Sequence, residues 1–272
     1  MNTQTEEPKL AETKSLLGVP FWTKGRTELR DLMRTSTTLI ELNGINAEVS
    51  IQAQDDAEHF GLLANNPTNL IDGEGVRKLL RFKYGESYER ISGSDYAADL
   101  CSLAHEEGWG VFLLGGSEES SAGAAKAMAK RFPGLRLEFY SPPFESNLDG
   151  TPLRGLGAAC DEVVLQRLDA FRPELLIGCF GAPKQEIWFR LHRDWLAERG
   201  CRVWMGAGGT FDFLSGRVTR APKLISRLGF EWLWRLAKNP VQRIGRMARR
   251  LPRFAVLGLT EALSYRIGRR PR

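Results

Sequence analysis

The segment 183-PKQE-186 places three side chains suited to chemistry next to one another. It follows the apolar run Leu175–Ile177 and a turn bracketed by glycines, which predicts a strand, a turn and then a helix. Lys184 offers charge to a phosphate, Gln185 can donate to and accept from a sugar or a base, and Glu186 can hold Lys184 or a ligand hydroxyl. The alternative is an acidic, well-capped helix start without a ligand.

Glycine-rich turns follow two other apolar runs. Gly115 and Gly116 close one run, and Gly206–Gly209, with Gly208 and Gly209 at its end, closes another. Backbone N–H groups that are not crowded by side chains can cradle a phosphate, although tight-turn geometry alone also explains glycine. No GxGxxG motif follows a strand and no P-loop motif is present. We therefore expect a phosphate-bearing ligand that is neither a typical dinucleotide nor ATP in a P-loop.

Asp72, in 70-LIDGEG-75, is a candidate general base because burial at the end of a strand raises a carboxyl pKa toward the working range. The alternative is an ordinary Asp-Gly turn. No DxD motif occurs, and the three histidines belong to separate helical stretches. We therefore expect no metal site and no cofactor. No GxSxG or Cys/His pairing indicates covalent catalysis.

These candidates need a scaffold, and the chain predicts one in which strands alternate with helices. The apolar strands are nearly continuous, which is typical of a parallel sheet covered on both faces. In such a sheet, ligands bind beyond the carboxyl ends of the strands. We expect an α/β fold with a Rossmann-like parallel sheet, helices on both faces and a basic C-terminal helical appendage. Its predicted strands are 47–52, 68–71, 110–116, 135–140, 174–179 and 202–206. Asp72, the two glycine-rich turns, the PKQE segment and 141–144 would then lie at one edge.

Charge is distributed unevenly along the 272 residues. Residues 217–272 carry 15 Lys and Arg against two acids, a net charge of +13, whereas the remainder carries 23 basic and 31 acidic residues, a net charge of −8. This asymmetry favours a polyanionic partner, either a membrane or a nucleic acid. The four widely spaced cysteines form no CxxC pair and indicate reduced thiols in a cytosolic setting. We see no secretory signal and no run long enough to span a membrane.

The tail mixes Trp, Phe and aliphatic residues with Arg at helical spacing, as membrane-interface helices do. A packed helical hairpin with a solvated face is one alternative. A nucleic-acid arm is another, although no RNP, KH or helix-turn-helix pattern supports it. The expected organisation is a disordered N-terminus at 1–14, a Rossmann-like domain at 15–216 that binds the phosphate-bearing ligand, and a basic amphipathic, membrane-associating appendage at 217–272.

Together these motifs resemble the WecG/TagA/CpsF family of bacterial glycosyltransferases. The resemblance covers roughly residues 16–250, and the pairing of PKQE with GGTFDFLSG and EWLWRL is its most specific part. The segments that carry it are 16-LLGVP-20, 65-NNPTNLIDGEGV-76, 90-RISGSD-95, 110-GVFLLGG-116, 133-PGL-135, 178-GCFGAPKQEIW-188, 205-MGAGGTFDFLSG-216, 219-TRAPK-223 and 229-GFEWLWRLAKNPVQRIGR-246.

The resemblance implies an inverting hexosyltransferase that moves a sugar from a UDP-sugar to a polyprenyl-diphosphate-linked saccharide. It also implies a cytoplasmic, peripheral membrane protein at the inner face of the plasma membrane. There the enzyme would act in the synthesis of exopolysaccharide or another cell-surface glycan. Family members can self-associate, so a homo-oligomer is among the expected assemblies, and nucleic acid is not an expected partner. Asp72 matches the family's proposed general base. The residues in stretches that line the nucleotide-sugar pocket are Gly115, Gly116, Pro143, Phe144, Gln185, Glu186, Gly208, Gly209 and Asp212. The residues that match the segment bringing arginines over the lipid diphosphate are Arg235, Arg243 and Arg246.

One segment departs from the family pattern. Members usually carry a functional Thr and Asn in the first strand-to-helix turn, and we take its counterpart to be 49-VSIQAQDDAE-58, which has neither. Ser50, Gln52 or Gln54 would then substitute. This departure motivates a second hypothesis, a catalytically silent UDP-sugar-binding scaffold of a polysaccharide assembly complex.

Overall fold

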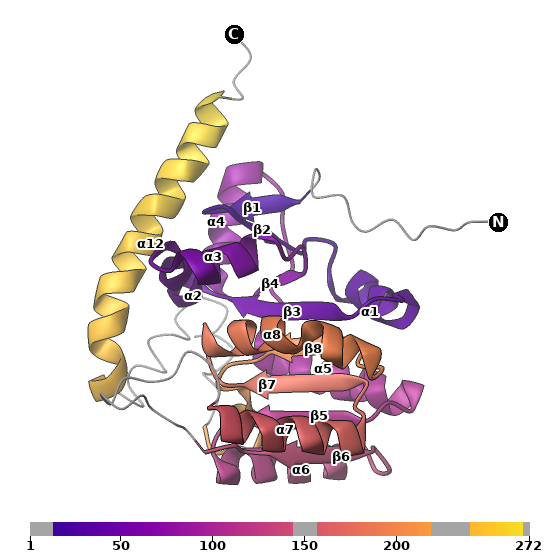
Figure 1. The fold of residues 1–272 in the computed structure, drawn as a ribbon. Helices are drawn as coiled ribbons and strands as arrows, with labels where there is room; N and C mark the ends of the chain where they lie inside the picture. Colours follow the sequence, from indigo (N-terminus) through magenta and orange to yellow (C-terminus); the bar gives the residue numbers. More distant parts are fainter. Residues whose placement is uncertain (1–12, 144–156, 219–239, 269–272) are drawn as a thin grey trace, which may run out of the picture. The chain divides into compact units, whose positions relative to one another are not determined.

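The structure is a computed structural model, and it describes residues 13–143, 157–218 and 240–268 (Figure 1). Its strands are β1 (Lys14–Leu16), β2 (Val19–Phe21), β3 (Ile40–Ile45), β4 (Asn69–Ile71), β5 (Val111–Gly115), β6 (Leu137–Tyr140), β7 (Leu175–Cys179) and β8 (Val203–Gly206). Its helices are α1 (Arg26–Thr35), α2 (Ala47–Gln54), α3 (Ala57–Ala64), α4 (Glu74–Tyr84), α5 (Gly93–Glu107), α6 (Glu118–Arg131), α7 (Ala158–Phe171), α8 (Lys184–Glu198), α9 (Thr210–Leu214) and α12 (Pro240–Gly268).

Six strands form one parallel sheet in the order β4-β3-β8-β7-β5-β6, and β1 and β2 form a separate antiparallel hairpin. The predicted α/β class and Rossmann-like sheet are therefore confirmed. The chain divides into two compact units. The first unit comprises Met1–Leu29, Gly44–Ser92 and Arg220–Arg272, and the second comprises Arg30–Asn43 and Gly93–Thr219. The domain bounds expected from the sequence stay a prediction.

The predicted strand at 47–52 is wrong, because Ala47–Gln54 forms helix α2. The side chain of Asn46 caps this helix by accepting hydrogen bonds from the backbone N–H groups of Glu48, at 2.9 Å, and Val49, at 3.1 Å. That cap outweighs the short apolar alternation that indicated a strand. The strand lies just before it, at β3, where Glu41 and Asn43 interrupt the apolar pattern.

The second unit builds its core on both faces of the sheet. Side chains of β5, β7 and β8 that point to one face, among them Phe112 and Trp204, pack against Val164 of α7 and Trp188 of α8. Figure 1 shows α7 and α8 together over this face. Helices α5 and α6 contact β7 and β5 from the other face.

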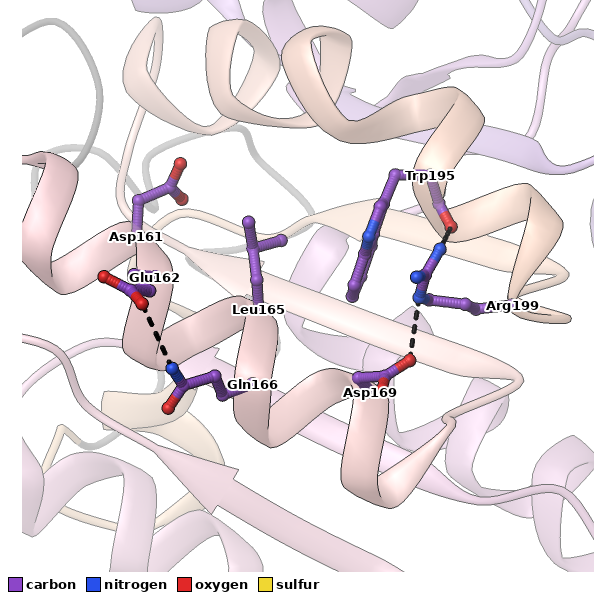
Figure 2. A pocket seen from close by; sticks show the side chains of 7 residues that line it. All are labelled: Asp161, Glu162, Leu165, Gln166, Asp169, Trp195 and Arg199. Atoms are coloured by element: carbon purple, nitrogen blue, oxygen red, sulfur yellow. Dashed lines mark hydrogen bonds and ion pairs between the residues drawn. The ribbon is translucent and has the colours of Figure 1, made fainter.

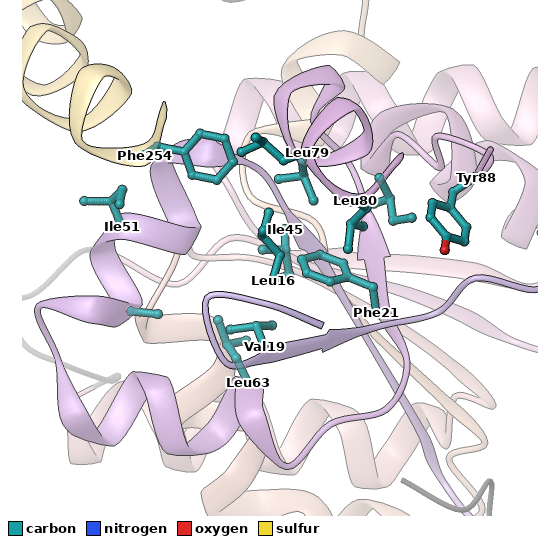
Figure 3. Packing of buried hydrophobic residues seen from close by; sticks show 13 residues of the cluster. Leu16, Val19, Phe21, Ile45, Ile51, Leu63, Leu79, Leu80, Tyr88 and Phe254 are labelled. Carbon is teal, nitrogen blue, oxygen red and sulfur yellow. The ribbon is translucent and has the colours of Figure 1, made fainter. Parts of the chain in front are cut away.

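The first unit has its own core, in which residues of the hairpin, α2, α3 and α4 surround Ile45 and Ile71 (Figure 3). Helix α12 contributes Phe254, which is 4% exposed. A buried ion pair also fixes α12, because Lys83 of α4 lies 2.5 Å from Glu261 of α12. The other carboxylate oxygen of Glu261 accepts a hydrogen bond from the backbone N–H of Leu17 at 2.6 Å. The C-terminal helix is thus part of the folded first unit.

Candidate functional site

The strand ends of the second unit lie level with one another. Asn43 of β3 pairs with Gly206 of β8, Gly206 pairs with Gly178 of β7, and Gly178 pairs with Leu114 of β5. The turns that follow these strands therefore start from one edge of the sheet. This edge brings together the Gly115–Gly116 turn, the start of α8 and the glycine loop, which we define as residues 206–209.

The Gly115–Gly116 turn is held from several sides. Both residues have positive φ, +94° and +74°, which favours glycine. A Cβ on Gly115 would lie 2.8 Å from the ring of Phe180. The hydroxyl of Ser121 donates to the carbonyl of Gly115, and the hydroxyl of Ser141 donates to the carbonyl of Gly116. The glycines therefore serve tight-turn geometry here, whatever else the turn binds.

Gln185 and Glu186 are almost completely buried, 4% and 1% exposed. The Gln185 amide nitrogen donates to Glu186 Oε1 at 2.8 Å, and Gln185 Oε1 accepts from the backbone N–H of Gly208 at 3.1 Å. The sequence suggested direct ligand contacts for both residues. In the structure both side chains point into the protein, and the Gln185 amide is hydrogen-bonded to the glycine loop. Lys184, by contrast, is half-buried at the first position of α8.

Burial changes the ionisation of this region. The pKa of Glu186 is raised to about 7, mainly by desolvation and to a smaller extent by the charge of Glu41, against the hydrogen bond from Gln185, which lowers it. Burial likewise raises the pKa of Glu41 to about 7, against the hydrogen bond from Asn43 and the charges of Arg193 and Arg190. Burial thus raises the pKa of both carboxyl groups toward neutrality.

The remaining predicted residues of the second unit lie around the same edge. The Asp212 carboxylate accepts a hydrogen bond from the Ser120 hydroxyl at 2.6 Å, so this side chain links α9 to the start of α6. Gly208 has a positive φ of +55°, Gly209 is exposed, and Pro143 is exposed in the loop after β6. Among the residues that the structure describes, no other atom lies within 4 Å of a Cβ built on Gly208, so this part of the loop is open toward them.

Asp72 lies in the first unit, directly after β4, and is half-buried. Its backbone N–H donates to the carbonyl of Ile45 at 3.1 Å. A Cβ on Gly44 would lie 3.5 Å from the Asp72 side chain, and a Cβ on Gly73 would lie 3.1 Å from Asn46. The carboxyl ends of β3 and β4 thus place Asp72 and Asn46 in one neighbourhood, where glycines permit close approach.

Asn46 is the residue that the sequence reasoning missed. The first strand-to-helix turn runs from β3 to α2, and Asn46 stands in it. Residues 49–58 lie within and after α2, so they are not this turn. Taking 49–58 as this turn was therefore wrong, and the turn itself holds an asparagine. The signal was present as an Asn N-cap followed by a helix-forming Ala-Glu pair.

Some predicted residues lie outside the description. Phe144 and Arg235 are outside the described residues, and Arg243 and Arg246 belong to α12 without their side chains being described. All four cysteines are free and buried, which agrees with the expectation of unpaired thiols. Burial raises the pKa of Cys179, at the end of β7, to about 12. Its thiol is therefore protonated at neutral pH and unsuited to nucleophilic attack.

A hollow of about 460 Å³ lies between α7 and α8 (Figure 2). Leu165 and Trp195 line it, and an ion pair of 2.8 Å between Arg199 and Asp169 closes one end. None of the predicted site residues lines this hollow. It is a depression on the outer surface of two helices, separate from the edge at which the strands end.

Within the described ranges, no three His, Cys, Asp or Glu side chains are grouped to hold a metal ion.

Of the helices that the structure describes, none combines the length and apolar character that crossing a membrane requires.

Residues 15–268 match the profile of the glycosyl transferase WecG/TagA/CpsF family, which is nearly the whole chain. The chain belongs to the WecG/TagA/CpsF family. The resemblance inferred from its motifs is confirmed, and glycosyl transfer in cell-surface glycan synthesis is the activity that membership implies.

Proposed function

We propose that this glycosyltransferase transfers a hexose, with inversion, from a UDP-sugar to a saccharide linked to polyprenyl diphosphate. The observation that carries the proposal is the level row of strand ends in the second unit. There the glycine loop is open above Gly208, and the Gly115–Gly116 turn directs no side chain outward. Backbone N–H groups in such turns stabilise the negative charge of a diphosphate.

The proposed reaction is a single in-line displacement. The acceptor hydroxyl oxygen attacks the anomeric carbon as the bond from that carbon to the UDP β-phosphate oxygen breaks, and UDP leaves with the bonding electrons. Asp72 takes the acceptor proton. Backbone N–H groups and Lys184 stabilise the charge that develops on the leaving UDP, so no metal ion is required. The absence of a DxD motif supports this metal-independent form.

The lipid-linked acceptor calls for a membrane surface, and α12 supports peripheral association. Its exposed apolar residues recur every three or four positions, which places them on one face: Val256, Leu259, Leu263 and Ile267 are 63%, 44%, 48% and 67% exposed. Arg249, Arg250 and Arg253 precede this face along the helix and Arg266 lies near its end, and a basic helix with exposed apolar residues is typical of a membrane interface. Arg235, Arg243 and Arg246 would bind the lipid diphosphate. We place the enzyme at the inner face of the plasma membrane.

The test is product formation. The full-length protein is incubated with a panel of radiolabelled UDP-sugars and a synthetic polyprenyl-diphosphate monosaccharide, with and without EDTA. We expect label in the lipid fraction for one donor, at the same rate in EDTA, and the opposite anomeric configuration in the product. Transfer that requires an added metal would refute the metal-independent mechanism. UDP binding without transfer from any donor would favour the silent scaffold.

A further inference from the structure

A polar cluster that holds the glycine loop lies under the surface of the second unit. Gln185 uses both ends of its amide, since the nitrogen donates to Glu186 at 2.8 Å and the oxygen accepts from Gly208 N–H at 3.1 Å. Both side chains are at least nine-tenths buried. Both polar groups of the Gln185 amide are therefore hydrogen-bonded within the protein. A contact between this amide and a ligand would break one of these hydrogen bonds.

The backbone is shaped to admit this amide. A Cβ on Gly206 would lie 2.8 Å from Gln185 Nε2 and 2.9 Å from Asn43 Oδ1, closer than carbon atoms approach such groups. Asn43 in turn donates to Glu41 at 2.7 Å. The first glycine of the loop therefore leaves room for two amides, each bonded to a buried carboxyl group.

We propose that Gln185 and Glu186 are positioning residues that anchor the glycine loop through the Gly208 N–H, and that the charge on Glu186 determines how firmly the loop is held. This inference rests on the proposed function, because the role of the loop in holding a UDP diphosphate is itself proposed. It assigns the two residues a role beneath the loop, without direct contact with the donor.

The charge dependence follows from what each group can donate. An ionised Glu186 only accepts, so it faces the Gln185 NH₂ and leaves the Gln185 oxygen for Gly208 N–H. A protonated Glu186 can instead donate to the Gln185 oxygen, which requires the amide to flip. The flipped amide turns its NH₂ group toward the Gly208 N–H, and because both groups are donors the hydrogen bond to the loop is lost. The charged groups that act on this pair are Glu41 on β3 and, through Glu41, Arg190 and Arg193 on α8. The raised pKa of Glu186 places this change near neutral pH.

Hydrogen exchange of the Gly208 amide tests this directly, in ligand-free full-length protein. After correction for intrinsic exchange, we expect its protection to rise about fivefold as pH increases from about 6 to about 8.5. Glu186→Gln, which keeps the shape but cannot ionise, should stay near the low-pH level throughout. The matched control on the same helix, Glu198→Gln, should follow the wild type, because Glu198 is 76% exposed.

Binding of UDP supplies the second readout. Gln185→Leu should abolish the pH-dependent protection and weaken UDP binding about tenfold, because Gly208 N–H loses its partner. Gly206→Ala should act in the same direction by displacing the amide. Thermal melts identify any variant that fails to fold. The pH profile of the wild type tests the proposal even if every variant fails to fold.

A wild-type protection that is flat across this pH range, or a Glu186→Gln profile that matches the wild type, would overturn the proposal. So would a folded Gln185→Leu protein with normal Gly208 protection. A wild type that shows the pH profile but does not bind UDP would contradict the proposed function while supporting the positioning pair.

Discussion

Replacing Glu261 with alanine is expected to release helix α12 from the first unit. The substitution removes the partner of Lys83, whose side chain is only 6% exposed, and the acceptor of Leu17 N–H. Breaking a buried ion pair by removing one partner costs about 3–5 kcal/mol, and hydrogen bonds to a charged group contribute about 1.5–3 kcal/mol each. Because Glu261 itself is 30% exposed, water replaces part of this, and we expect a cost of about 3 kcal/mol.

The assay is backbone hydrogen exchange of α12, which reports local opening. A cost of about 3 kcal/mol corresponds to roughly a hundredfold faster exchange in Glu261→Ala. Arg253→Ala is the matched control on the same helix. It removes an ion pair to Asp55 whose side chains are 47% and 51% exposed, which should cost less than about 1 kcal/mol.

A double variant separates charge from packing. Lys83→Met with Glu261→Leu replaces the pair by apolar side chains and should recover the part of the loss that comes from the unpaired buried charge, although Leu17 N–H still lacks its acceptor. The reasoning is refuted if Glu261→Ala exchanges no faster than Arg253→Ala. It is also refuted if the double variant opens as readily as Glu261→Ala.

One buried carboxyl and two glycines of α12 give further predictions. As pH rises from about 4.3 to about 7, the free energy of unfolding should fall by up to roughly 1.4 kcal/mol per pH unit. In this range Glu186 is protonated in the folded protein and ionised in the unfolded chain. Urea titrations of Glu186→Gln should show a flatter dependence, and an unchanged slope would count against its raised pKa. Gly245→Ala should stabilise α12 by about 1 kcal/mol, since its Cβ meets no atom within 4 Å. Gly258→Ala, whose Cβ would lie 2.4 Å from Leu79, should fall at least about 1 kcal/mol below it in urea unfolding, and equal stability would contradict the close packing.

The elements that the sequence predicted well are those with an unambiguous apolar pattern. The buried strands β5, β7 and β8 lie where continuous apolar runs placed them, and helix α8 follows β7 and its glycine-bracketed turn as predicted. The strand β3 was missed, because its strand-like run includes Glu41, Asn43 and Gly44. Glu41 and Asn43 hydrogen-bond to each other in this strand, and Asn43 lies beside Gly206 of β8. The contact with Gly206 forms only in the folded sheet.

The candidate site shows the same division. The sequence placed the glycines, Asp72 and PKQE at strand ends, since chain direction in a parallel sheet determines that edge. It could not show that Gln185 and Glu186 turn inward, because a helix start presents successive residues to different sides. Nor could it show that Asn46 approaches Gly73, since that contact joins residues from two separate strand ends.

The central claim is that Asp72 removes the acceptor proton, and one comparison tests it most directly. Initial transfer rates of the wild type and Asp72→Asn are measured with the same UDP-sugar and lipid-linked acceptor, alongside the affinity of each protein for UDP. We expect the rate to fall by a factor of about 10²–10⁴, with UDP affinity nearly unchanged. An Asp72→Asn protein that transfers sugar at the wild-type rate would contradict the account.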